Sequence, residues 1–315
     1  MDSERVLVTG AGGFLGAHFI DHFSALGHRV AGVGRLASST SSAFSGNPVD
    51  GRISSRMSLP DPAFLDVIRA FRPTLLVDCA STASVAWSVE QPYQDFCRAV
   101  DVCAFNLEAT RLAAPRCRFV LLSSASVYGN PQALPISEYA PLQPVSPYGY
   151  HKRLCEMLAE EYATLHGLKV VVLRIFSAYG EGLRRQVVHD ICYRFADPAL
   201  SHVELSGTGR ESRDFIHARD VARIIEVIHR ADARGVFNAA TGVQTTIAEV
   251  ADHIGRHFEQ RKQVVFNGVA RPGDPINWQA CTARIGELGY CSSVELSAGL
   301  ARYIKWFKAV SGVGV

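Results

Sequence analysis

The sequence lacks a large excess of charge of either sign. Its 32 basic and 30 acidic residues leave a formal net charge of +2, and both signs are spread along the chain. A nucleic-acid-binding surface or a polybasic membrane anchor needs positive charge gathered on one face. The charge pattern therefore predicts neither nucleic acid nor a membrane as a partner, and binding is expected at local sites.

Long apolar runs are also missing. No stretch approaches the length of a membrane span, and the first residues do not form the basic segment and apolar stretch of a secretory signal. The 8 cysteines never form a Cys-x-x-Cys pair, and the 11 histidines show no metal-ligand spacing. We therefore expect a cytoplasmic protein with reduced, mostly buried thiols and no metal site.

Short β-branched runs alternate with helical stretches up to about residue 180. This alternation predicts an α/β fold of the Rossmann type, in which helices cover both faces of a doubly wound parallel sheet. Residues 1–180 are expected to form the dinucleotide-binding domain. Residues 181–315 are expected to form mainly a smaller α/β lobe that binds the substrate, with part of 215–245 returning to the first domain. The expected strands and helices are Val6–Thr9, Phe14–Leu26, Arg29–Val33, Phe64–Phe71, Leu75–Cys79, Tyr93–Ala114, Phe119–Ser123, Tyr148–His166 and Lys169–Ile175.

A glycine turn follows the first expected strand and opens the first expected helix. Gly10, Gly13 and Gly16 would permit the tight turn, the approach of the backbone to a pyrophosphate, and close packing of helix on strand. The helix N-terminus, at Phe14 and Leu15, would face the anion. The turn therefore predicts a dinucleotide site.

A carboxylate is absent where the second expected strand ends. An NAD enzyme usually places Asp or Glu there to accept hydrogen bonds from the adenosine ribose. This chain has Arg35 instead, followed by hydroxyl residues that include Ser38. A guanidinium fork suits a 2′-phosphate, whereas a carboxylate would repel it. The sequence therefore favours NADP and leaves NAD as the alternative.

Tyr148 and Lys152 lie four residues apart at the start of a helical stretch, and so share one helix face. An ammonium next to a phenol, together with a cationic nicotinamide, stabilises the phenolate. Ser124 ends an apolar strand, at the sheet edge where ligands of such folds bind. We therefore predict that Tyr148 exchanges a proton with an alcohol–ketone couple and that Lys152 supports it. Both are expected to contact the cofactor, and Ser124 is expected to hold the reacting oxygen.

At these residues the chain resembles the extended short-chain dehydrogenase/reductase family, also called the NAD-dependent epimerase/dehydratase family. The resemblance covers nearly the whole chain. Besides the glycine turn and Tyr-x-x-x-Lys, it rests on Ser124-Ala125-Ser126-Val127-Tyr128-Gly129, Ser146-Pro147-Tyr148, Arg213-Asp214-Phe215-Ile216-His217 and Arg271-Pro272-Gly273-Asp274.

The resemblance implies a nucleotide-diphosphate sugar as the substrate. Arg213, Arg271 and Asp274 inherit the nucleotide-diphosphate contacts, because a diphosphate suits guanidinium forks and a ribose diol suits a carboxylate. The other inherited positions are Ala80 on the cofactor side and Ser84, Val85, Ser88, Ser126 and Ser177 on the sugar side.

Some positions depart from the family pattern. The usual Asn of the helix after the third strand aligns with Ala99, unless Asn106 serves instead. The adenine-contacting Asp corresponds to Ser58 or Asp61, and Asp78 stands where the family has His. His151 lies beside the Tyr–Lys pair but off its face, and is interpreted as a surface or interface residue.

The residues after Ser124 are Ala125 and Ser126, whereas family members that eliminate water usually carry acids there. The first hypothesis is therefore an NADPH-dependent 4-ketoreductase of a nucleotide-linked 6-deoxyhexose. The alternative is a 4-epimerase that retains NAD, and a third hypothesis is a nucleotide-binding regulator without catalysis. A homodimer is expected, since two helices carry apolar residues on more than one face and the corresponding family pair forms a two-fold interface.

Overall fold

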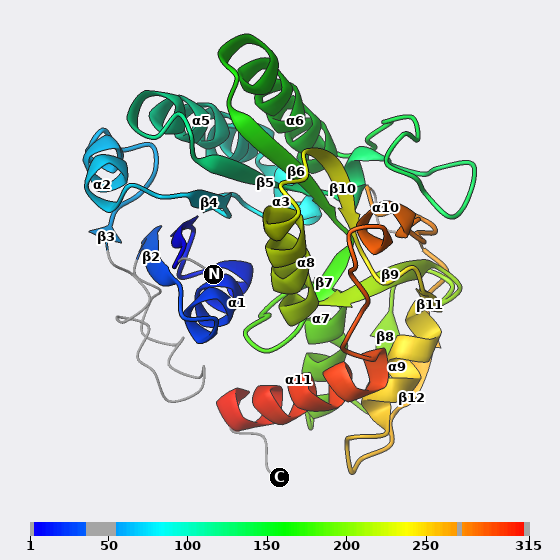
Figure 1. The fold of residues 1–315 in the computed structure, drawn as a ribbon. Helices are drawn as coiled ribbons and strands as arrows, with labels where there is room; N and C mark the ends of the chain where they lie inside the picture. Colours follow the sequence, from blue (N-terminus) through cyan, green and yellow to red (C-terminus); the bar gives the residue numbers. More distant parts are fainter. Residues whose placement is uncertain (1–2, 36–54, 270–272, 312–315) are drawn as a thin grey trace.

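A computed structural model describes residues 3–35, 55–269 and 273–311. Its centre is a seven-stranded parallel sheet with the order β10-β6-β5-β4-β1-β2-β3 (Figure 1). The strands are β1 (Arg5–Thr9), β2 (Arg29–Gly34), β3 (Ser55–Arg56), β4 (Leu75–Asp78), β5 (Arg118–Ser124), β6 (Lys169–Ile175) and β10 (Gly235–Ala239).

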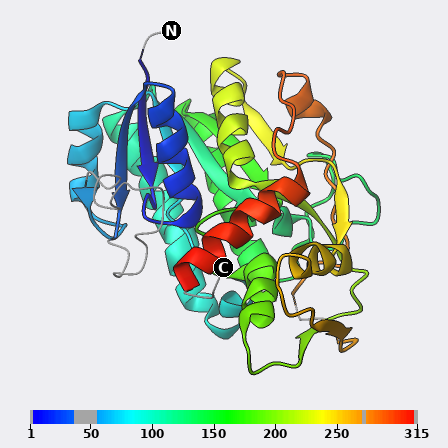
Figure 2. The ribbon, with the colours of Figure 1, turned by 90° about the horizontal axis from the view of Figure 1, so that it is seen from below.

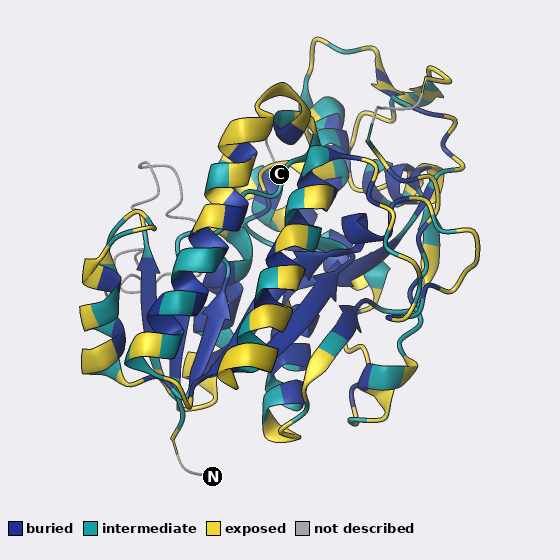
Figure 3. Ribbon diagram, turned by 90° about the horizontal axis from the view of Figure 1, so that it is seen from above, coloured by how far each residue is buried: buried dark blue, intermediate teal, exposed yellow. Residues whose placement is uncertain are grey.

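Helices cover both faces of this sheet, and each face has its own apolar core. One core lies under α1 (Phe14–Ala25) and α8 (Ala218–Arg230). The other lies under α2 (Ala63–Phe71), α5 (Val102–Ala113) and α6 (Pro147–His166). Figure 3 shows the buried strands enclosed between helices whose outer sides are exposed. The doubly wound parallel fold is therefore confirmed, as near-continuous apolar strands require two covered faces.

The chain order reverses between β1 and β4, which are neighbours in the sheet. From β1 the chain proceeds outward to β2 and β3, and then crosses back to β4 on the other side. Crossovers on opposite sides leave a crevice at the carboxyl ends of the two strands, where ligands of open α/β sheets bind. The ends of β1 and β4 are therefore the place to look for a site.

Beyond β6 the chain builds a second lobe and then returns to the main sheet. α8 and β10 rejoin the sheet, because β10 pairs with β6. The lobe itself has a third apolar core under α7 (Gln186–Ala196), α9 (Ile247–Gly255) and α11 (Leu296–Ser311). Figure 2 shows α11, in red, running along this lobe. Its strands are β7 (Ser177–Tyr179), β8 (His202–Leu205), β9 (Ser212–His217), β11 (Gln244–Thr246) and β12 (Gln263–Phe266), and α10 (Ala283–Gly286) follows.

The helix expected over 93–114 is divided in the structure. A short α4 (Pro92–Phe96) leads into a π-helical turn, Cys97–Asp101, before α5 begins. A π turn widens the helix and redirects its carbonyl groups, and here the carbonyl of Ala99 also accepts a hydrogen bond from the Cys155 thiol of α6 at 3.5 Å. A further short helix, α3 (Val85–Glu90), precedes α4.

The cysteines are free thiols, and their burial differs. Cys103, Cys117, Cys155 and Cys192 are buried, whereas Cys291 is exposed, so the expectation of buried thiols does not hold for every cysteine. In the part of the chain that the structure describes, no three His, Cys, Asp or Glu side chains gather as a metal site. Among the same residues, no helix is both long and apolar enough to span a bilayer.

Candidate active site

The glycine turn lies at the carboxyl end of β1 and leaves the backbone open. Gly10 has a φ of 61°, and a Cβ built there would lie 2.6 Å from the carbonyl oxygen of Cys79. Only glycine fits this position without strain. α1 starts at Phe14, and no side chain caps it at Gly13. The first N–H groups of α1 therefore remain available to an anion, and the turn fits the pyrophosphate of a dinucleotide.

A hydrogen-bonded link joins the glycine turn to the end of β4. The Thr9 hydroxyl donates to Oδ1 of Asp78 at 2.6 Å, and accepts from the backbone N–H groups of Cys79 and Ala80 at 3.1 and 3.2 Å. The Asn106 amide also donates to Asp78 Oδ1, at 2.9 Å. Burial raises the pKa of Asp78 even though these hydrogen bonds oppose the shift. The link holds Ala80, a predicted cofactor contact, beside the turn.

The structure shows the contacts or exposure of four positions that depart from the family pattern. Asn106 is fully buried and donates to Asp78, while Ala99 lies in the π turn. Ser58 is exposed, and the Asp61 carboxylate accepts from the backbone N–H of Ala63 at the start of α2.

Arg35 and Ser38 are the two residues predicted to contact the adenosine end of the cofactor. Arg35 is exposed and directly follows β2. Ser38 lies outside the described residues. A 2′-phosphate is accordingly supported by the sequence position of Arg35 alone.

Tyr148 and Lys152 lie in the first two turns of α6, which begins with a capped end. Ser146 accepts a hydrogen bond from the N–H of Gly149 at 3.2 Å, and Pro147 occupies the first helical position. Both features favour a helix start at this point. The backbone N–H of Tyr148 also donates to the Ser88 hydroxyl at 3.1 Å, which fixes the helix start against α3.

The Lys152 ammonium is buried beside the Tyr148 ring. Its Nζ lies 5.8 Å from the centre of that ring, and donates to the carbonyl of Leu122 at 2.9 Å and to the Ser81 hydroxyl at 3.2 Å. Burial alone would lower the pKa of Lys152, but the charges of Tyr148, Cys155 and neighbouring groups together raise it above its ordinary value. Lys152 therefore stays charged next to the phenol.

Ser124 lies at the carboxyl end of β5, two residues after Leu122. Its Oγ accepts from the N–H of Ser126 at 3.2 Å and so caps a short 3₁₀ turn, Ala125–Val127. A Cβ on Gly149 would lie 2.7 Å from the carbonyl oxygen of Ser126, so the start of α6 packs directly on this turn. The fold thus brings Ser124, Tyr148 and Lys152 to one edge of the sheet. The Ser126 hydroxyl is buried and has no hydrogen-bond partner among the described residues.

The second lobe brings an arginine and a carboxylate near this edge. The Arg213 guanidinium donates to the carbonyls of Ser212 and Ile276 and lies 5.6 Å from the centre of the Trp278 ring. Burial lowers the pKa of Arg213, and the charge of the exposed Asp274 opposes that shift.

Gly273, directly before Asp274, lies against α3 and the start of α6. A Cβ on Gly273 would lie 3.1 Å from the Val85 side chain and 3.2 Å from that of Ser146. Ser84, just before Val85, caps α3 by accepting from the N–H of Trp87 at 3.2 Å. Ser177 begins β7 and is half-buried. Arg271 lies outside the described residues.

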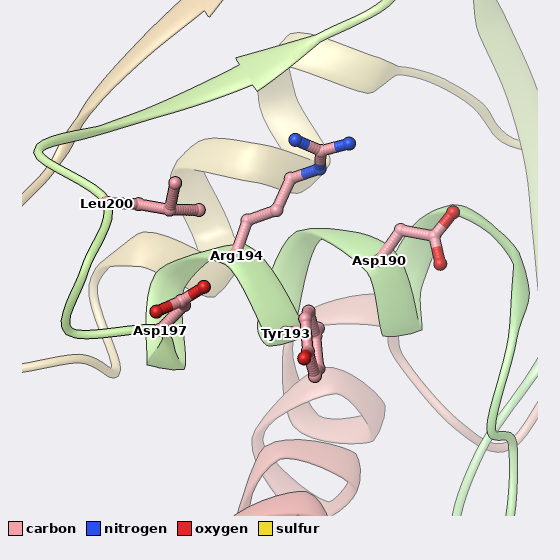
Figure 4. A pocket seen from close by; sticks show the side chains of 5 residues that line it. All are labelled: Asp190, Tyr193, Arg194, Asp197 and Leu200. Atoms are coloured by element: carbon pink, nitrogen blue, oxygen red, sulfur yellow. The ribbon is translucent and has the colours of Figure 1, made fainter.

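A shallow depression on α7 contains none of the predicted site residues. It is lined by Asp190, Tyr193, Arg194, Asp197 and Leu200 (Figure 4). The carbonyls of Arg194 and Asp197 already accept from the Lys262 ammonium. The depression belongs to the second lobe and holds no acid–base pair of the Tyr–Lys kind.

The sequence interpretation missed the groups that hold the acid–base residues in place. Ser81 and the Leu122 carbonyl bind Lys152, and Ser88 binds the backbone of Tyr148. A backbone carbonyl carries no sequence signal, and Ser81 resembles an ordinary loop residue. Ser88 was expected on the sugar side, but it is fully buried and its hydroxyl binds the backbone of Tyr148. His151 is not a plain surface residue, because its Nδ1 lies 2.6 Å from Oδ2 of the buried Asp95.

The family model for the NAD-dependent epimerases and dehydratases matches residues 6–240 of this chain. The chain belongs to the NAD-dependent epimerase/dehydratase family. The match spans the main sheet from β1 to β10, including the glycine turn, Ser124 and the Tyr–Lys helix.

Relatives of known activity are similar along nearly their whole length. The UDP-glucose 4-epimerase of Mycolicibacterium smegmatis is 29% identical over 312 residues, which cover 96% of this chain and 98% of the relative. Among solved structures, the UDP-glucose 4-epimerase of Thermus thermophilus in complex with NAD is 28% identical, with a TM-score of 0.86 and coverage of 96% and 99%. MoeE5 in complex with UDP-glucose and NAD is 28% identical, with a TM-score of 0.84 and coverage of 97% and 99%.

Proposed function

We propose that this protein is a 4-epimerase of UDP-linked sugars that works with a retained NAD. The buried Lys152 ammonium beside Tyr148, at the carboxyl edge of a Rossmann sheet, is the observation that carries the proposal. The relatives described above support the epimerase over the NADPH-dependent 4-ketoreductase that Arg35 first suggested. The intact Ser124, Tyr148 and Lys152 argue against a regulator without catalysis.

In this proposal the chain supplies proton transfer and orientation. The Tyr148 phenolate accepts the proton of the sugar 4-hydroxyl and later returns it to the same oxygen. The Lys152 ammonium stabilises the phenolate, and the Ser124 hydroxyl donates a hydrogen bond to the reacting oxygen. A nicotinamide, when bound, supplies the acceptor and donor of the hydride at C4. Gly10, with the first turn of α1, would hold its pyrophosphate.

The second lobe is proposed to hold the nucleotide diphosphate. Arg213 offers guanidinium N–H groups, and Asp274 offers a carboxylate to a ribose diol. Because the 273–274 segment packs over Val85 and Ser146, a nucleotide bound there would be adjacent to the Tyr–Lys helix. Ser84, Ser126 and Ser177 would then face the sugar.

Cofactor content and sugar turnover test the proposal together. Mass spectrometry of the denatured, freshly purified protein is expected to release about one NAD per chain, since an epimerase must keep the cofactor that it reduces. The untreated protein is expected to interconvert UDP-glucose and UDP-galactose with no added reductant. A site that is empty after purification, takes up NADPH and converts a 4-keto sugar would overturn the epimerase in favour of the reductase.

We also propose that two copies associate through α4 and α6. Apolar side chains on these adjoining helices are exposed: Tyr93, at 77%, and Phe96 on α4, and Leu154 and Met157, at 51%, on α6. Such an exposed apolar patch is typical of an interface.

The oligomer is tested by light scattering after size-exclusion chromatography. The wild-type protein is expected to elute with twice the mass of one chain, and Met157→Glu with the mass of one, since a charge in an apolar interface is costly. Leu26→Glu, at an exposed leucine at the end of α1, is the matched control and should leave the mass unchanged. A wild-type protein that stays monomeric at micromolar concentration would exclude the interface.

A further inference from the structure

Asp95 is a fully buried carboxylate, on the short helix α4 next to the catalytic helix α6. Both of its oxygens are used. The Thr82 hydroxyl donates to Oδ1 at 2.5 Å, and His151 Nδ1 lies 2.6 Å from Oδ2. A carboxylate oxygen accepts hydrogen bonds, so this contact is a hydrogen bond when Nδ1 of His151 carries the proton. Burying a carboxylate is unfavourable unless such partners compensate it, and here they come from two different elements.

These contacts close a ring of interactions that includes the Lys152 side chain. His151 directly precedes Lys152 on α6, and Thr82 directly follows Ser81, whose hydroxyl accepts from Lys152 Nζ at 3.2 Å. Going round the ring, Lys152 binds Ser81, the backbone continues to Thr82, Thr82 binds Asp95, Asp95 binds His151, and the backbone returns to Lys152. The Ser81 hydroxyl in turn donates to the Thr82 carbonyl at 3.2 Å.

The ring fixes one of the two anchors of the Lys152 ammonium. The other anchor is the Leu122 carbonyl, which belongs to β5 and does not depend on the loop. Ser81 lies in the connection between β4 and α3, outside the paired strands of the described chain. Without the Asp95 bridge, this connection would be held to α6 by the Lys152 contact and, further along, by α3, whose Ser88 accepts from the backbone N–H of Tyr148. His151 is further oriented by Phe96, whose ring meets the imidazole edge to face at 5.7 Å.

We propose that Asp95 and His151 are positioning residues, which hold Ser81 against Lys152 and so keep the ammonium directed at Tyr148. The inference rests on the proposed function, because it matters for catalysis only if Tyr148 and Lys152 transfer the proton. Neither residue touches the reacting atoms. Their effect reaches the reaction through the electrostatic support that Lys152 gives to the phenolate.

Two pairs of variants test the ring, each with a conservative partner. Thr82→Val removes the hydroxyl and keeps the shape, whereas Thr82→Ser keeps the hydroxyl. His151→Phe removes the donor and keeps a ring, whereas His151→Asn places an amide N–H near the position of Nδ1. The first member of each pair is expected to lower kcat for UDP-glucose by about tenfold or more, with KM changed much less, since misplaced catalytic groups affect the reaction step. The conservative partners are expected to stay near wild type.

The ionisation of Tyr148 gives a second readout that needs no sugar. Phenolate absorbance of the NAD-loaded protein is titrated against pH, and the curve of Tyr148→Phe is subtracted to isolate this tyrosine among the 10 in the chain. Thr82→Val and His151→Phe are expected to move the midpoint upward by roughly half a pH unit or more, because the ammonium is less well placed. A loss of folding stability alone would not shift this midpoint.

The outcomes separate the two proposals. If Thr82→Val and His151→Phe lose thermal stability but keep the wild-type kcat and titration midpoint, the ring is only a structural brace and the inference is wrong. The same holds if His151→Asn is as impaired as His151→Phe. If instead Tyr148→Phe retains full turnover, the proposed function fails. An inactive Tyr148→Phe with unaffected Thr82 and His151 variants would reject the positioning role alone.

Discussion

Tyr148→Phe is expected to lower turnover of a UDP-sugar by at least about 100-fold, because it removes the hydroxyl that Lys152 supports at the sheet edge. The phenyl ring fills nearly the same space, and Tyr148 is bound to its surroundings through its backbone N–H, which the change leaves intact. The fold and the cofactor content should therefore stay close to wild type. Initial rates and NAD content, measured on the same preparation, check both expectations.

Tyr150→Phe is the matched control for this prediction. It deletes the same atom two residues further along α6, at a side chain that is 59% exposed. Turnover should be unchanged in this variant. Equal activity of wild type, Tyr148→Phe and Tyr150→Phe would show that no tyrosine of this helix start transfers a proton, and would remove the basis of the proposed mechanism.

The sheet could be predicted from the sequence because its strands are buried on both faces. The strands β1, β5 and β6 have uninterrupted apolar centres, and the glycine turn after β1 marks where the first helix begins. The break at 97–101 could not be predicted, because a π turn depends on what packs against its carbonyl groups, and the partner here is Cys155 from a later helix.

The candidate site could be predicted where a short sequence pattern identifies the residues. Tyr148 and Lys152 are recognisable by their spacing, which a helix converts into proximity. Ser81, Asp95 and Thr82 were not, because their contacts join segments up to 71 residues apart and follow no local pattern. At the exposed Arg35, the residue type led to a prediction that the comparisons do not support. It suggested NADP, whereas the solved structures of relatives contain NAD.

Breaking the ion pair between Glu156 and Arg174 is expected to be among the most destabilising single changes. Glu156 lies one turn after Lys152, and both of its oxygens accept from Arg174 of β6, at 3.0 and 2.8 Å. Burial would lower the pKa of Arg174, but Glu156 and the Tyr128 hydroxyl together raise it, so the guanidinium stays charged inside the core. Removing one partner of a buried pair leaves an uncompensated charge, which lowers the free energy of unfolding by about 3–5 kcal/mol.

Urea unfolding of Glu156→Leu, Arg174→Met and the double variant measures this interaction. Each single change is expected to lower the free energy of unfolding by about 3 kcal/mol or more, and the double variant by clearly less than the sum, since it leaves no isolated charge. Asp66→Asn, which breaks the exposed pair with Arg69, should change it by less than about 1 kcal/mol. Strictly additive effects of the two buried changes would mean that the pair contributes nothing to holding α6 on the sheet. In that case the position of Lys152 would depend on its own hydrogen bonds and on the ring through Asp95.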